Sequence, residues 1–147
     1  TLDNPRVGDR MKQAGAAVGI NFTGKCDRSP NTLLAHVLMQ HALNSTGENN
    51  TLAELLFKGY FTDGIFPDKA GLLQLASVAG LDAAGAAAAL EDPAAASTAQ
   101  LEARQWSGAG IGGVPFFLVN GERLFSGAHP PASFVAAFAN AAPLESL

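Results

Sequence analysis

The chain of 147 residues has the length of one domain, and 48% hydrophobic with 15% charged residues is a globular composition rather than a disordered one. A net charge of -4 without a basic cluster argues against binding to nucleic acid or to an anionic membrane. No apolar run approaches the ~20 residues of a membrane span, and residues 1–10 lack a signal-peptide pattern. We therefore expect a soluble, cytoplasmic protein.

Apolar residues at helical spacing predict five or six helices in the first 107 residues. The first covers about 5–19, and a short strand-like piece at 20–22 and a loop over 23–30 follow it. An asparagine or threonine at the start of 31–45 can cap the next helix.

Local capping patterns place the remaining helices of this region. Thr51 and Glu54 have the spacing of a capping box, in which each side chain satisfies a backbone donor of the other. Asp68 and Asp92 are further cap residues, and Gly80 stands where a left-handed residue ends a helix. The predicted extents are 51–62, 68–79, 82–90 and 93–106.

After a glycine-rich connector the pattern changes from helix to strand. A strand at 114–119 leads into Asn120 and Gly121, a pair typical of a type I′ hairpin turn, and a second strand at 122–125 follows. A final helix is predicted at 133–140. The first strand is apolar on both faces, and a lone hairpin is marginally stable, so we expect further strands from an upstream segment or another chain.

The single cysteine, Cys26, limits the chemistry, because it excludes an internal disulfide, a Cys-x-x-Cys pair and a zinc site built on cysteines. Lys25 and Arg28 would favour its thiolate, yet its loop position favours an incidental cysteine over a catalytic one. We expect no metal and no tightly bound cofactor.

None of the histidines forms a nucleophile–base pair that can be recognised from the sequence. His41 falls on an apolar helix face and is interpreted as a core residue, whereas His129 lies in the loop after the second strand. Trp106 is also expected in the core.

Five segments together resemble the DsbA-like family, and within it the branch named for the frenolicin-biosynthesis protein, a group of dithiol-disulfide isomerases. Residues 113–121 (GVPFFLVNG) and 126–130 (SGAHP) are similar to the C-terminal end of that family. Residues 31–36, 56–61 and 80–82 resemble the helical insertion of the branch, in the same order, and this likeness implies that His36 fixes the insertion. The likeness covers nearly the whole chain.

The resemblance implies the α/β class and an incomplete thioredoxin-like fold. Residues 1–22 would be a helix and connector of the thioredoxin-like domain, 23–107 the helical insertion domain, and 108–147 the C-terminal ββα part. The β-α-β portion that opens the family's fold and carries its Cys-x-x-Cys has no counterpart here. We therefore expect the chain to be a C-terminal portion that is inactive alone and has no catalytic residue of its own.

The resemblance also implies a substrate site at Gly113, Val114 and Pro115. In the family the matching proline is cis and faces the cysteine pair, and the residue before it offers its N–H and C=O to a thiol-bearing substrate. From the residues alone, Pro115 could instead simply begin a strand, where a missing N–H costs little.

Three functions follow from these expectations. The first is a thiol-disulfide oxidoreductase or isomerase acting on thiol-bearing proteins or peptides, with its redox cysteines outside this chain. The second is a non-catalytic binding or dimerisation module that assembles through its open strand edge, for instance as a homodimer. The third is a glutathione-dependent isomerase or transferase of the kappa-like class, in which a serine replaces the first cysteine.

Overall fold

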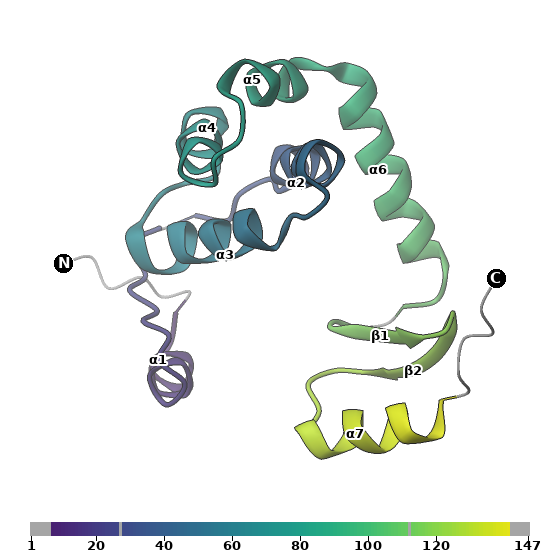
Figure 1. Ribbon diagram of the computed structural model, residues 1–147. Helices are drawn as coiled ribbons and strands as arrows, with labels where there is room; N and C mark the ends of the chain where they lie inside the picture. The colour runs from purple at the N-terminus through teal and green to yellow at the C-terminus, as the bar shows by residue number, and fades with distance from the viewer. Residues whose placement is uncertain (1–6, 27, 112, 142–147) are drawn as a thin grey trace. The chain divides into compact units, whose positions relative to one another are not determined.

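The computed structural model describes residues 7–26, 28–111 and 113–141, and the chain divides into two compact units, 1–101 and 102–147 (Figure 1). The described part is mostly helical, with one small hairpin, which confirms the predicted order of helices, strand, turn, strand and helix. None of the helices in these ranges has the length and apolar character needed to cross a membrane. The elements are α1 (Asp9–Ala16), α2 (Leu33–Thr46), α3 (Asn50–Lys58), the π-helical turn η1 (Gly59–Asp63), α4 (Lys69–Val78), α5 (Ala83–Glu91), α6 (Pro93–Gly108), β1 (Phe116–Val119), β2 (Glu122–Ser126) and α7 (Pro131–Asn140).

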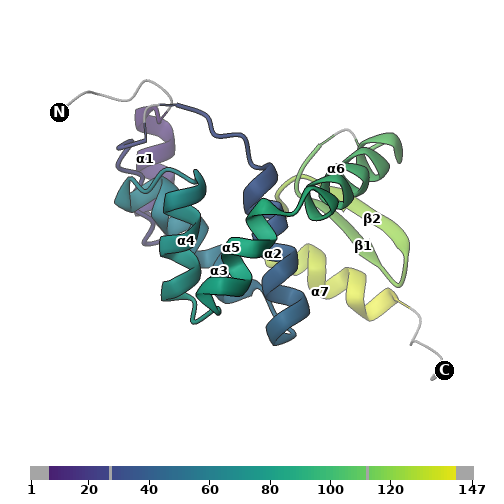
Figure 2. The ribbon, with the colours of Figure 1, turned by 90° about the horizontal axis from the view of Figure 1, so that it is seen from above.

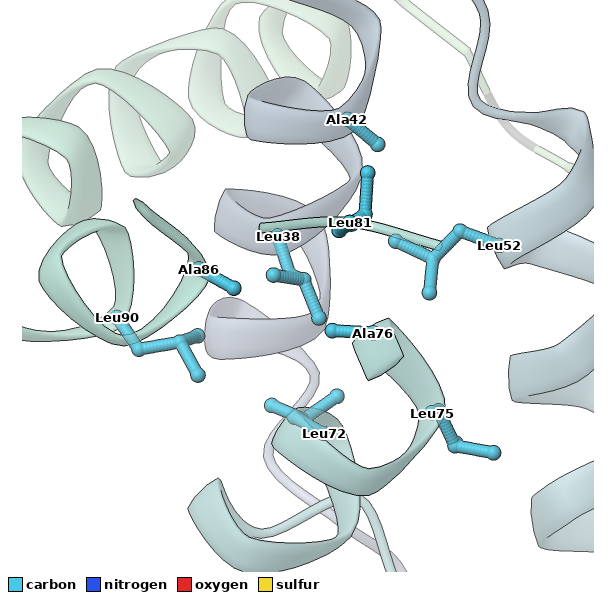
Figure 3. Close-up of a cluster of buried hydrophobic side chains, with 9 residues drawn as sticks. All are labelled: Leu38, Ala42, Leu52, Leu72, Leu75, Ala76, Leu81, Ala86 and Leu90. Carbon is cyan, nitrogen blue, oxygen red and sulfur yellow. The ribbon is translucent and has the colours of Figure 1, made fainter. Parts of the chain in front are cut away.

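The core of the first unit lies between α2, α3, α4 and α5, which pack side by side in both ribbon views (Figures 1 and 2). Each of these helices contributes buried leucine or alanine side chains to one cluster. Figure 3 shows side chains from different helices turning toward the same interior space. The cluster consists of Leu38, Ala42, Leu52, Leu72, Leu75, Ala76, Leu81, Ala86 and Leu90.

Aspartate caps fix where the later helices of this unit begin. Asp68, Asp82 and Asp92 each accept a hydrogen bond from a backbone N–H two or three residues further on, at 3.0, 2.6 and 2.8 Å. Gly80, just after α4, has a φ of 79°. The predicted caps at Asp68 and Asp92 and the left-handed end at Gly80 are therefore confirmed.

The predicted capping box at the start of α3 is wrong. The helix begins at Asn50, so Thr51 lies inside it and cannot serve as the residue before it. Asn49 is the residue before the helix, and its side chain forms no cap hydrogen bond. Glu48 instead satisfies a donor of the first turn, because its Oε2 accepts a hydrogen bond from the Thr51 N–H at 3.1 Å. This backbone hydrogen bond is the largest cause that lowers the pKa of Glu48, since it stabilises the carboxylate.

The piece at 20–22, predicted as strand-like, belongs to a non-strand connector that is tied to the π-helical turn. The Thr23 N–H donates to the Phe61 carbonyl at 3.0 Å, and the Thr23 hydroxyl donates to the Thr62 carbonyl at 2.8 Å. In return the Thr62 hydroxyl donates to the Asn21 carbonyl at 2.9 Å. Within the described residues this connector therefore bonds to the π-helical turn and pairs with no strand.

The first helix, α1, is shorter than the predicted 5–19, and the apolar residues of that predicted segment are only partly covered within the described residues. Val7 is buried, whereas Met11 and Val18 are exposed. The Phe22 ring lies so close to Gly15 that no Cβ would fit there. The end of α1 is therefore held by its own following connector.

The second unit is built on an antiparallel hairpin. Its register joins Phe116 to Ser126 and Val119 to Glu122, with an irregularity that leaves one extra residue, Leu124, in β2. Asn120 and Gly121 have φ values of 53° and 81°. This confirms the predicted turn, because both central positions of a type I′ turn need positive φ.

Helix α7 covers one face of this hairpin with aromatic contacts (Figure 1). The Phe134 ring meets Phe117 and Phe125 edge-on, with ring centroids 4.8 and 4.9 Å apart. No described residue of this unit is fully buried, and Trp106, which was expected in the core, is half-exposed on α6. A two-stranded sheet with one helix is too small to enclose a core, which explains why that expectation is wrong.

Candidate functional site

The candidate site is the segment Gly113, Val114 and Pro115, which we call the cis-proline turn. The Val114-Pro115 peptide bond is cis, which confirms the conformation expected from the family resemblance. β1 begins only after it, at Phe116, so the predicted strand at 114–119 starts two residues too early. Val114 is 85% exposed and stands at the entrance to an apolar strand.

The loop after β2 holds the cis-proline turn in place. The Gly127 N–H donates a hydrogen bond to the Pro115 carbonyl at 2.7 Å, directly after the ladder pair of Phe116 and Ser126. Gly127 has a φ of 85°, a conformation that only glycine adopts readily. A backbone hydrogen bond thus joins the cis-proline turn to the residue that follows β2, at the open end of the hairpin.

Arg123 of β2 anchors the chain before the turn. Its Nη2 donates to the Ala109 carbonyl, just after α6 ends, and its guanidinium lies 5.7 Å from the centre of the Phe116 ring. The sequence reasoning missed this residue. The one feature of the sequence that points to Arg123 is a charged side chain beside apolar neighbours in the predicted second strand.

His129 lies in the same loop as Gly127. Its Nε2 is 3.2 Å from the Ser126 carbonyl oxygen, and its ring lies over Phe125 with centroids 4.2 Å apart and a 36° angle between the planes. The structure therefore places His129 beside the residues that hold the cis-proline turn.

The second edge of β1, beside the turn, has no strand partner among the residues that the structure describes. Within the described ranges β1 pairs with β2 alone, and no loop or turn hydrogen bond involves the Val114 backbone. β1 contains four apolar residues and no charge, whereas β2 carries Glu122, Arg123 and the bulged Leu124. Charges and bulges discourage pairing at a strand edge. The outer edge of β1 is therefore better suited than that of β2 to pair with another strand.

The other sequence candidates lie in the first unit. Cys26, the chain's single cysteine, is buried there. His36 is exposed on α2, and half-buried His41 packs against Gly85 of α5. Among the residues that the structure describes, no three His, Cys, Asp or Glu side chains gather in a group that could hold a metal ion.

The described elements thus form a helical unit, a cis-proline turn, a hairpin and a final helix, in that order along the chain. None of the curated proteins matches the sequence. The family model for the DSBA-like thioredoxin domain, however, matches residues 5–139, which is nearly the whole sequence and includes both units. The chain therefore belongs to the DSBA-like thioredoxin domain family.

Proposed function

We propose that this chain is the substrate-binding portion of a thiol-disulfide oxidoreductase or isomerase, of the branch named for the frenolicin-biosynthesis protein. Gly113, Val114 and Pro115 would contact a thiol-bearing protein or peptide. The observation that carries the proposal is the 85% exposure of Val114 beside an uncharged strand edge, in a chain of the DSBA-like family. An extended peptide can add to such an edge through main-chain hydrogen bonds.

The redox step needs sulfur atoms from outside this chain. In thiol-disulfide exchange a substrate thiolate attacks one sulfur of an enzyme disulfide, forming a mixed disulfide and releasing the other sulfur as a thiolate. A second substrate thiolate then attacks the mixed disulfide, so the substrate loses two electrons and the enzyme becomes a dithiol. Cys26 is a single buried thiol and cannot supply both sulfur atoms.

A non-catalytic binding or dimerisation module is the second candidate function. The same open edge favours it, because an uncharged apolar strand can pair with its copy in another chain. Exposed Val135 and Phe138 on α7 would add apolar surface to such a contact.

The reading frame that encodes the chain separates the two functions. The redox proposal expects a strand and a Cys-x-x-Cys motif encoded ahead of Thr1, and catalysed oxidation of a dithiol peptide by the full product. A frame without that motif removes the redox proposal. Analytical ultracentrifugation at micromolar concentration tests the dimerisation module, because a chain that sediments as a monomer does not form the proposed homodimer.

Substitution of Val114 tests the binding site directly. The probe is a fluorescein-labelled, extended twelve-residue peptide with one S-methylcysteine, and its binding to the chain is followed by fluorescence anisotropy. Burying a valine contributes about 1.5–3 kcal/mol, so Val114→Asp is expected to weaken binding by about tenfold or more.

The matched control is Val18→Asp, because Val18 is also exposed, at 72%, and lies in the other unit. This variant should bind the peptide as the unmodified chain does. Equal affinities for the Val114 variant and the control would refute the proposed site.

A further inference from the structure

We propose that His129 is a positioning residue for the cis-proline turn, through which it sets the affinity for an extended peptide. This inference rests on the proposed function of the turn. It assigns a role to a side chain that has no part in the redox step itself.

The hydrogen bond of His129 defines the state of its ring. A carbonyl oxygen can only accept, so the bond to Ser126 requires that Nε2 carries the hydrogen atom. In the neutral ring Nδ1 then holds the lone pair. The imidazole thereby joins the last residue of the short loop 126–129 to the first.

Stacking restrains the same ring in a second direction. The His129 ring lies over Phe125, whose ring also meets Phe117 and Phe134. Phe125 is therefore held by its aromatic neighbours and offers a fixed surface. One hydrogen bond and one ring contact together give this exposed histidine a defined orientation.

Gly127 lies within the loop that His129 closes. Its N–H donates the 2.7 Å hydrogen bond to Pro115, and glycine is the residue type with the greatest backbone freedom. Without the imidazole, the loop loses the side-chain bond between Ser126 and His129. The Gly127 N–H is then free to leave Pro115, and Val114 loses its fixed place at the start of β1.

Three variants of the full chain separate the hydrogen bond from the stacking. His129→Gln keeps an N–H donor at a similar reach, His129→Phe keeps a ring over Phe125 but no donor, and His129→Ala keeps neither. His36→Ala is the control, because His36 is exposed in the other unit. Equal thermal unfolding temperatures would show that all variants remain folded.

The first measurement is hydrogen exchange of the Gly127 amide by NMR, which needs no peptide. We expect exchange to be faster by about threefold to tenfold in the Ala and Phe variants, because one hydrogen bond is worth about 0.5–1.5 kcal/mol. The Gln variant should restore the protection. Unchanged exchange in the Ala variant would overturn the positioning role.

The second measurement is anisotropy with the S-methylcysteine peptide. The Ala and Phe variants should bind about threefold to tenfold more weakly, whereas the Gln and His36 variants should bind normally. If the unmodified chain binds no peptide, the proposed function fails and this inference fails with it. If Val114→Asp abolishes binding while His129→Ala has no effect, only this inference fails.

Discussion

Truncation of Leu38 should destabilise the first unit strongly. Leu38 is 0% exposed and lies within the cluster formed by α2, α3, α4 and α5 (Figure 3). Leu38→Ala removes three carbon atoms, and at about 0.8 kcal/mol for each the lost burial amounts to about 2.4 kcal/mol. The cavity adds a further cost, so we expect a total loss of about 3–4 kcal/mol in the free energy of unfolding.

Urea unfolding followed by far-ultraviolet circular dichroism measures this loss. The control is Leu101→Ala, because Leu101 is 62% exposed on α6 and belongs to the same unit. Its unfolding free energy should change by no more than about 0.5 kcal/mol. A loss below about 1 kcal/mol for Leu38→Ala, or equal losses for the two variants, would refute the assigned core.

Two further predictions concern local structure. The folded-state pKa of Glu48 lies below its ordinary value of 4.5, so its stabilisation is present above that pH and is lost as the pH falls through the lowered pKa. Glu48→Gln should therefore lower the melting temperature at pH 7, with a difference that vanishes in acid; a constant difference would contradict this. Gly64→Ala and Gly80→Ala should each cost about 1–2 kcal/mol, because both φ values are near 80°. Gly64→Ala should cost more, since its Cβ would lie 2.7 Å from the Cβ of Lys25 while Gly80 has open space, and equal losses in urea unfolding would exclude that contact.

Features that depend on a few adjacent residues could be predicted from the sequence. Asp68 and Asp92 cap helices as expected, because a short side chain needs only the N–H groups of the next turn. Asn120 and Gly121 form the expected turn for a similarly local reason. The cis bond before Pro115 was predictable only through the family resemblance, since proline alone permits both isomers.

Competition between nearby groups and contacts between distant residues could not be predicted. Thr51 and Glu48 both lie where they can serve the start of α3, and the sequence does not show which side chain reaches the free N–H. Thr23 bonds to Phe61, which lies 38 residues further along the chain. Arg123 and His129 of the candidate site were left unassigned for the same reason, because their roles depend on a loop folding back to the turn.

The π-helical turn makes one part of this fold sensitive to the number of residues as well as to their identity. The N–H groups of Gly64 and Ile65 both reach back to the Gly59 carbonyl at 2.8 Å, whereas an α-helix joins residues four apart. Deleting one residue here would let the turn close as α-helix and would rotate Phe61 and Thr62 away from the connector that they hold. Chains that share this anchorage should therefore share the length of this segment, even where its side chains differ.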